Sequence, residues 1–125
     1  MIKLKDVLTT NGATLDRNSF KELDLNDGFM VSLIGLEHKV AVMGLDDDIL
    51  KDMIADMQAV AHAYSVMLER DTYIGLWVDS DYVYFDISIK VNTIGHAYKL
   101  GRLNKQLAIF DNKYKKVLTL DNFDI

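Results

Sequence analysis

The sequence contains no cysteine and no proline among its 125 residues. The lack of cysteine excludes disulfide bonds and thiolate metal ligands, and the lack of proline leaves the turns to Gly, Asn and Asp. No apolar run of about 18 residues is present, so no membrane-spanning helix is expected. The opening MIKLKDVLTT lacks the apolar core and the small-residue cleavage site of a secretory signal. Together these absences favour an intracellular protein.

The length and composition suit one globular domain. Half of the residues are hydrophobic and 26% are charged, which is ordinary for a globular chain. A chain of 125 residues can bury one core but is short for two. We expect residues 1–125 to form a single domain, in which residues 1–27 are a partly irregular N-terminal arm. Residues 2–8 are expected to be a short strand or an arm.

The charge is unevenly distributed along the chain. Residues 1–89 contain 7 Lys or Arg and 16 Asp or Glu, whereas residues 90–116 contain 7 and 1. The formal net charge of the whole chain is −5. An acidic chain with one basic segment suits a local anion site better than a long nucleic-acid track, which needs a broadly positive surface. We therefore expect no long nucleic acid as a partner.

A long amphipathic helix is predicted over residues 46–70, where apolar residues recur at intervals of three and four. Asp46, Asp47 and Asp48 open it, because carboxylates accept hydrogen bonds from free amides and complement the helix dipole. A metal site at these carboxylates is the weaker interpretation, since consecutive residues splay around a helix axis and no glycine-centred calcium loop follows. We expect no metal.

Residues 29–43 predict a hairpin with strands Phe29–Ile34 and Lys39–Met43 and with His38 in its turn. A lone turn histidine is usually solvated, so no catalytic role is expected for it. A second hairpin is predicted over residues 73–89, with its turn at residues 79–81.

Alternation divides the second hairpin into a core side and an aromatic side. The core side carries small and branched apolar residues together with Phe85. The opposite side carries Tyr73, Gly75, Trp77, Tyr82, Tyr84, Asp86 and Ser88. Large exposed apolar patches usually mark binding or subunit surfaces, so this side is expected to have a partner.

A short basic helix is predicted after Asn92 or Thr93, either of which can cap it. We expect its buried side to consist of Ile94, Ala97, Leu100 and Leu103 or Asn104. Its exposed side is expected to carry His96, Lys99, Arg102 and Lys105. Strands at residues 106–110 and 117–120 follow. The elements together predict an α+β fold, with a mainly antiparallel sheet covered on one side by the long helix.

No catalytic motif is found in the sequence. The three histidines are far apart, and there is no P-loop, no G-x-S-x-G and no H-E-x-x-H. We expect neither an enzyme nor a cofactor. The aromatic side and the basic helix instead supply parts that hold a nucleotide, because rings stack on bases and helix N-termini bind phosphates. The competing interpretation is that the rings seal a homodimer and that the basic residues merely solvate the helix.

Several segments of the chain resemble a known family. They are Gly28–Leu33, Tyr73–Asp79, Val83–Ser88, Leu100–Arg102 and Asn104–Asp111. These segments resemble small phage proteins of the Thoeris anti-defence type, the first-described sponge family of that group. The resemblance covers about the last half of the chain and the strand at residues 28–33.

The resemblance implies a protein that does no chemistry and acts in the host cytoplasm. Members of that family bind cyclic ADP-ribose isomers, made by bacterial TIR-domain enzymes, at sites between subunits, and some also hold cyclic oligonucleotides at separate sites. We therefore expect both ligand classes and a homodimer or higher oligomer. The expected ligand-binding residues are Trp77, Tyr82 and Tyr84 for stacking, Asp86 and Asn92 for base or ribose, Arg102 and Lys105 for phosphates, and Phe85 if a bulge turns it outward.

The second hypothesis is an acidic phage inhibitor that blocks a host or CRISPR nuclease by direct protein contact. The acidic residues from Asp46 to Asp56 would then form the contact surface. A virion or assembly protein is a third hypothesis.

Overall fold

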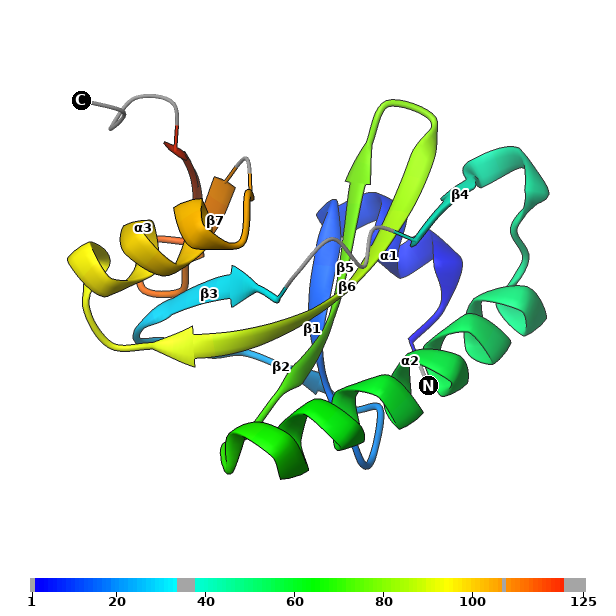
Figure 1. Cartoon of the computed structure of the whole chain (residues 1–125). Helices are drawn as coiled ribbons and strands as arrows, with labels where there is room; N and C mark the ends of the chain where they lie inside the picture. Colours follow the sequence, from blue (N-terminus) through cyan, green and yellow to red (C-terminus); the bar gives the residue numbers. More distant parts are fainter. Residues whose placement is uncertain (1, 34–37, 107, 121–125) are drawn as a thin grey trace. The chain divides into compact units, whose positions relative to one another are not determined.

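In a computed structural model, residues 2–33, 38–106 and 108–120 are described, and they contain three α-helices, one 3-10 helix and eight β-strands (Figure 1). Every strand pairing with a defined register is antiparallel. The α+β class with one long helix and one short basic helix is therefore confirmed. No helix in these ranges is long and apolar enough to cross a bilayer.

The chain divides into two compact units. Unit 1 comprises Met1–Leu23 and Leu36–Ile87, and unit 2 comprises Asp24–Gly35 and Ser88–Ile125. This division does not test the prediction that residues 1–125 form a single domain, which stays a prediction. Each unit is described separately below.

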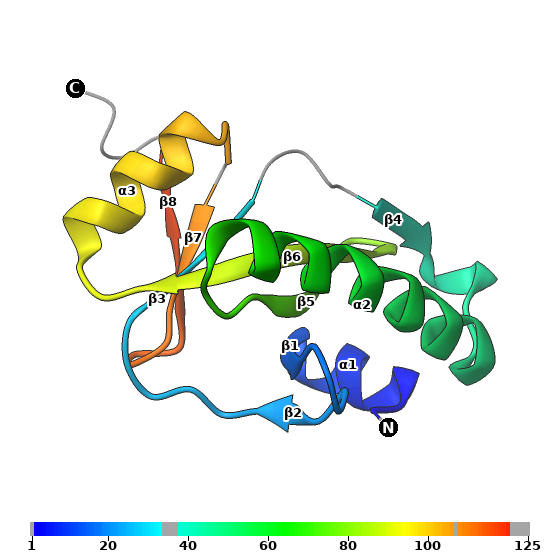
Figure 2. The same cartoon turned by 60° about the horizontal axis from the view of Figure 1, so that its bottom comes forward.

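Unit 1 contains the long helix and most of the strands. Its elements are α1 (Leu4–Thr10), β1 (Gly12–Asp16), β2 (Glu22–Leu23), β4 (His38–Ala41), η1 (Val42–Gly44), α2 (Asp47–Leu68), β5 (Tyr73–Asp79) and the first part of β6 (Tyr82–Val91). The strand order is β2-β1-β5-β6, and β4 also pairs with β6. Figure 2 shows α2 running along β5 and β6, and α2 contacts β5.

The core of unit 1 lies between α2 and one face of these strands. The buried side of α2 consists of Leu50, Ile54, Met57, Ala61 and Ser65. The strands contribute Leu15, Ile74, Leu76, Val83, Phe85 and Ile87. Each fully buried aliphatic or phenyl side chain stabilises the fold by roughly 1.5–3 kcal/mol relative to exposure. The predicted core side of the 73–89 hairpin is therefore confirmed for these hairpin residues, whereas Val78, predicted on the same side, is half-buried.

Unit 2 contains β3 (Phe29–Ser32), the end of β6, α3 (Ile94–Leu103), β7 (Ala108–Asp111) and β8 (Lys116–Thr119). Its strand order is β6-β3-β7-β8. Asn112 ties this unit together, because its amide donates to the Asp27 carbonyl oxygen at 2.9 Å and its backbone N–H donates to the Gly28 carbonyl oxygen at 3.0 Å. Lys90 adds an ion pair with Asp27 at 2.9 Å.

For residues 2–8, the alternative of a strand is wrong, because this segment forms the helix α1. The backbone N–H of Leu4 donates to Asp47 Oδ1 at 2.8 Å, which fixes the start of α1 to the start of α2. Val7 is fully buried, and Asn11 ends the helix in the left-handed conformation at φ 63°. Tertiary packing therefore decides the structure of a segment too short to be a stable helix alone.

The hairpin predicted at residues 29–43 is also wrong. β3 pairs with residues 88–91 of β6 and with β7, whereas β4 pairs with residues 82–85 of β6. The ten residues of β6 thus supply hydrogen-bonding partners for both strands, which do not pair with each other. His38 begins β4 rather than lying in a turn, and residues 34–37 of the predicted turn lie outside the described ranges.

Two helix faces differ from their predictions at the ends. In α3, Ile94 was expected to be buried but is 46% exposed. Of the alternatives Leu103 and Asn104, Leu103 is 72% exposed and Asn104 is half-buried, while Ala97 and Gly101 face inward. A Cβ at Gly101 would lie 3.0 Å from Leu120 Cδ1, so close packing selects the small residues. The apolar periodicity predicted for residues 46–70 also overstates burial at the end of α2, where Met67 is 66% exposed.

Candidate functional site

The most distinctive surface of unit 1 is a stack of two aromatic rings on the side of the hairpin away from the core. The centroids of Trp77 and Tyr84 are 4.2 Å apart, and their planes differ by 14°. The two-residue connection between β5 and β6 places these residues opposite each other across the hairpin. Trp77 is 41% exposed, so part of its ring system is accessible to a planar ligand.

A third ring and a cation lie next to this stack. Tyr82 is tilted by 58° against Tyr84, with 6.5 Å between the ring centroids, and is 38% exposed. The Nζ atom of Lys39 lies 4.8 Å from the Tyr82 ring centroid. Lys39 was not among the predicted site residues. Its sequence neighbours give no signal for this role, because only the register of β4 on β6, in which Lys39 pairs with Tyr84, brings it to the rings.

Two glycines shape the same surface. Gly12 of β1 pairs with Trp77, and a Cβ there would lie 2.5 Å from the Leu76 carbonyl oxygen and 3.2 Å from Trp77 Cα. A Cβ at Gly75 would collide with Oδ1 of Asp86 and lie 3.0 Å from its Cγ. The Asp86 carboxylate therefore packs over Gly75. We call the group of Lys39, Trp77, Tyr82, Tyr84 and Asp86 the aromatic face.

Phe85 does not belong to the aromatic face. It is fully buried, and it pairs with His38 in the regular register of β4 and β6. The bulge that would turn Phe85 outward is not found there, so its inclusion among the predicted ligand-binding residues is corrected to a core role.

The remaining predicted residues lie in unit 2. Asn92 is exposed and precedes the cap of α3, which is Thr93, whose Oγ1 accepts from the His96 N–H at 3.3 Å. Arg102 lies in the last turn of α3 and is exposed, and Lys105 follows the helix at φ 57°. The structure thus brings together Trp77, Tyr82, Tyr84 and Asp86 in unit 1. It places Asn92, Arg102 and Lys105 in the other unit.

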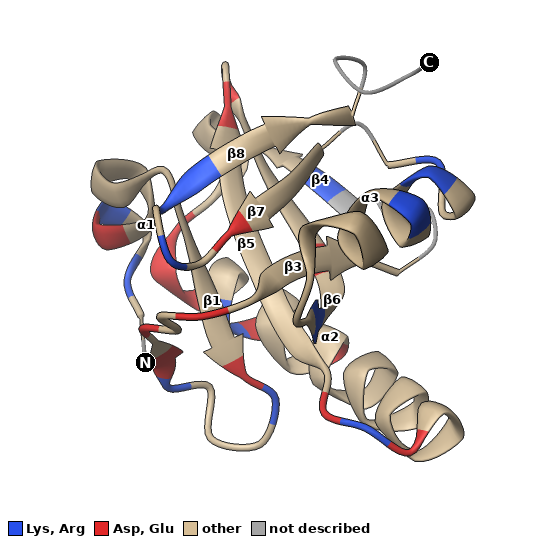
Figure 3. Ribbon diagram, turned by 90° about the vertical axis from the view of Figure 1, so that its left-hand side faces the viewer, with Lys and Arg blue, Asp and Glu red and all other residues tan. Residues whose placement is uncertain are grey.

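The two units differ in charge. The sequence of unit 1 contains 7 Lys or Arg and 14 Asp or Glu, whereas unit 2 contains 7 and 5. Figure 3 shows basic segments on α3 and at the start of β8.

Two ionisable groups have shifted pKa values. Asp16 is the last residue of β1, and the backbone N–H groups of Ser19 and Asn18 hold its pKa below the ordinary value of 3.8. In α3, burial raises the pKa of the Tyr98 hydroxyl.

Two carboxylates at the start of α2 accept hydrogen bonds from backbone amides. Asp46 Oδ1 accepts from the Ile49 N–H at 2.8 Å, and Asp47 Oδ1 accepts from Leu4. The capping interpretation is thus confirmed for Asp46, whereas Asp47 binds the first residue of α1 instead of an amide of α2. Within the described ranges, no three His, Asp or Glu side chains lie close enough together to hold a metal ion.

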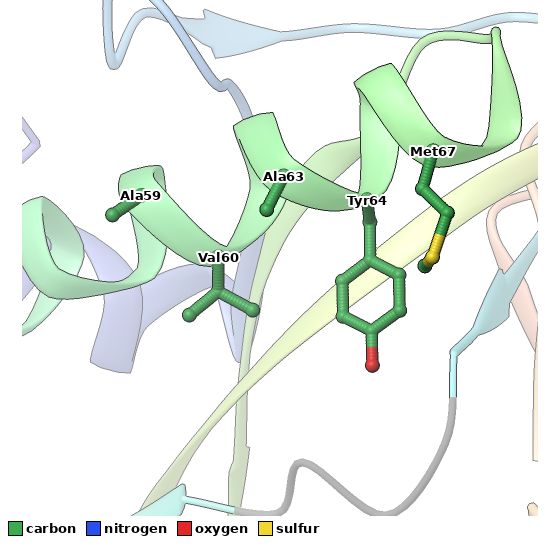
Figure 4. A pocket seen from close by; sticks show the side chains of 5 residues that line it. All are labelled: Ala59, Val60, Ala63, Tyr64 and Met67. Carbon is green, nitrogen blue, oxygen red and sulfur yellow. The ribbon is translucent and has the colours of Figure 1, made fainter.

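An apolar hollow lies on the surface of α2. Its lining consists of Ala59, Val60, Ala63, Tyr64 and Met67 (Figure 4). No charged side chain lies among these residues, so the hollow does not offer a contact for a phosphate. The aromatic face is the better candidate for a charged planar ligand.

No protein-family model, no curated protein and no solved structure matches this chain.

Proposed function

We propose that this protein is a phage anti-defence sponge, which binds a cyclic ADP-ribose isomer made by a TIR-domain protein and sequesters it without cleaving it. The observation that carries this proposal is the exposed Trp77–Tyr84 stack, with Lys39 and Asp86 beside it. A cyclic ADP-ribose isomer has an adenine to stack, a pyrophosphate to neutralise and ribose hydroxyls to donate hydrogen bonds. Each of these groups has a chemically matched partner on the aromatic face.

Stacking supplies the first part of the affinity. A base on an aromatic side chain contributes about 1–3 kcal/mol without requiring a particular sequence or base. The Asp86 carboxylate, which lies over Gly75, accepts hydrogen bonds from ribose hydroxyls or from the adenine amino group. Carboxylate acceptors repel phosphate, so Asp86 favours the base and ribose over the pyrophosphate at this position.

Sequestration requires tight binding, because a sponge acts by stoichiometry. Nanomolar affinity corresponds to about −12 kcal/mol, which stacking and a few polar contacts supply only in an enclosed site. The aromatic face is partly exposed in one copy. We propose that a second copy of the chain closes the site, so that the protein acts as a homodimer or higher oligomer in the host cytoplasm. Cyclic oligonucleotides are proposed as ligands of a second site, and the roles predicted for Asn92, Arg102 and Lys105 remain predictions.

A thermal-shift screen with cyclic ADP-ribose isomers and cyclic oligonucleotides tests the proposal. A ligand at 100 times its dissociation constant stabilises the folded protein by about 2.7 kcal/mol, which raises the melting temperature by several degrees. We expect one isomer to do so in the wild type and to be recovered intact by mass spectrometry. The Trp77→Ala variant is the control, and the same ligand concentration should raise its melting temperature by clearly less than that of the wild type. A flat screen, or conversion of the isomer to a product, contradicts the proposal.

The second candidate is an acidic inhibitor of a host or CRISPR nuclease. One observation favours it: Asp48, Asp52 and Asp56 are exposed at intervals of four residues, which places them along one side of α2. A flat ligand screen, combined with inhibition of a nuclease that is lost in Asp48→Asn/Asp52→Asn/Asp56→Asn, would support this function instead. A protein that neither binds these ligands nor inhibits a nuclease would instead fit the hypothesis of a virion or assembly protein.

A further inference from the structure

We propose that Lys39 supplies the anion contact of the aromatic face, so that one unit recognises both the base and the phosphate of its ligand. This inference rests on the proposed function and identifies a residue that neither charge distribution nor the family resemblance indicates. Its ligand class is an aromatic base that carries a phosphate or pyrophosphate group.

The position of Lys39 is set by strand pairing. In the register of β4 on β6, Lys39 pairs with Tyr84 and Ala41 pairs with Tyr82. The Nζ atom nevertheless lies 4.8 Å from the centroid of Tyr82, so the side chain leans diagonally across the sheet. The small Ala41 side chain leaves this diagonal open. The ammonium group thus lies over the ring of Tyr82, and the neighbouring ring of Tyr84 stacks on Trp77.

Lys39 forms no ion pair with any carboxylate in the described ranges. By contrast, Arg17, another basic residue of unit 1, pairs with Asp71 at 3.0 Å. A ring face satisfies one side of an ammonium group and leaves its N–H donors available for an anion. The geometry at Lys39 therefore suits a phosphate oxygen on the side away from Tyr82.

The charge of unit 1 makes this cation decisive. Its 14 acidic residues outnumber its 7 basic residues, so a phosphate approaching the aromatic face meets repulsion unless a cation lies at the site. Arg102 and Lys105, to which the sequence assigned the phosphates, belong to unit 2. Lys39 is the basic residue whose contact with the rings is observed.

Fluorescence titration with AMP and adenosine tests this inference, since these probes differ by one phosphate group. Trp77 is the sole tryptophan of the chain, so its emission reports on the stack directly. We expect the wild type to bind AMP about tenfold more tightly than adenosine, equivalent to about 1.4 kcal/mol. We expect Lys39→Met to abolish this preference with little change in adenosine affinity, and Lys39→Arg to retain it.

Lys113→Met is the matched control. Lys113 lies 5.3 Å from the centroid of the Tyr114 ring in unit 2, so this variant removes the same kind of contact elsewhere. It should keep the wild-type preference for AMP. In the wild type, raising the salt concentration should weaken the binding of AMP and leave that of adenosine unchanged, because salt screens the contact. This second measurement needs no variant and holds if Lys39→Met fails to fold.

Three results overturn the inference: no AMP response, a preference for AMP that survives in Lys39→Met, or an AMP affinity that is insensitive to salt. These outcomes are separable from failure of the proposed function. If no cyclic ADP-ribose isomer binds but the Lys39-dependent preference for AMP is found, the sponge function fails and the inference stands. If an isomer binds equally well to wild type and Lys39→Met, the inference fails and the sponge function stands.

Discussion

The two glycines of the aromatic face predict opposite responses to the same substitution. Gly12 and Gly75 both lie in strands and both have occupied space where a Cβ would be. At Gly12 the obstacle is backbone, since the Cβ would lie 2.5 Å from the Leu76 carbonyl oxygen and 3.2 Å from Trp77 Cα. At Gly75 the obstacle is the end of the Asp86 side chain, which can rotate away.

We therefore expect Gly12→Ala to lower the free energy of unfolding by about 1–3 kcal/mol, the usual cost of overpacking, because β1 and β5 must move apart. Gly75→Ala should change it by less than about 1 kcal/mol, since the displaced carboxylate is offset by the gain of about 0.5–1 kcal/mol on removing a strand glycine. Gly75→Ala should nevertheless weaken ligand binding, because Asp86 leaves its place beside the stack.

Urea denaturation followed by Trp77 emission measures both free energies in one assay. Asp86→Ala/Gly75→Ala is the control for the second variant: without the carboxylate the alanine meets no obstacle there, so the double variant should be at least as stable as Asp86→Ala. Equal destabilisation by Gly12→Ala and Gly75→Ala, or a more stable Gly12→Ala, would refute the packing that we describe for this surface.

Three further predictions concern the core, a helix cap and pH. Phe85→Ala should lower the free energy of unfolding by about 3–5 kcal/mol, measured by urea denaturation, because Phe85 is fully buried. A change below about 1 kcal/mol would contradict its assignment to the core. Asp46→Ala should cost about 0.5–2 kcal/mol through loss of the bond to the Ile49 N–H, measured by urea denaturation, whereas Asp46→Asn should cost less. The pKa of Asp16 is lowered in the folded state, so its stabilisation is present above its ordinary pKa of 3.8 and is lost as the pH falls through the folded value. The stability difference between wild type and Asp16→Asn should therefore shrink below pH 3.8, and a difference that grows there would contradict the assignment.

Local patterns in the sequence predict the parts of the fold that depend on neighbours in the chain. The cap at Asp46 and the apolar periodicity after it predict α2, and the alternation of apolar residues on either side of the turn predicted at residues 79–81 predicts β5 and β6 with Phe85 inside. These features depend on side chains only a few residues apart. They require no knowledge of which distant segments meet.

The incorrect predictions concern interactions between distant segments. α1 has only seven residues, and its start is fixed by Asp47, which lies 43 residues away. The sequence predicts that β3 and β4 pair in a hairpin because they are close in the chain. In the structure, each of them pairs with a different segment of β6. The inward side of α3 follows from the close approach of Leu120 to Gly101, which periodicity alone does not reveal.

The candidate site divides in the same way. The alternation of inward and outward side chains along the strands predicts Trp77, Tyr82 and Tyr84, because they share one side of a single hairpin. It cannot find Lys39, whose contact with the rings depends on the register of a strand more than 40 residues earlier in the chain. The excess of positive charge in residues 90–116 instead favours α3 as the phosphate site, and α3 belongs to unit 2.

The central claim is that the Trp77–Tyr84 stack holds a cyclic ADP-ribose isomer and releases it unchanged. Isothermal titration calorimetry of the wild type and of Trp77→Ala with each isomer tests it most directly. It is followed by mass spectrometry of the ligand recovered from the calorimeter. We predict nanomolar binding of one isomer by the wild type, a loss of affinity of about 1–3 kcal/mol or more in Trp77→Ala, and recovery of the ligand with its mass unchanged. Equal binding by both proteins, no binding by either, or a ligand of altered mass would contradict the claim.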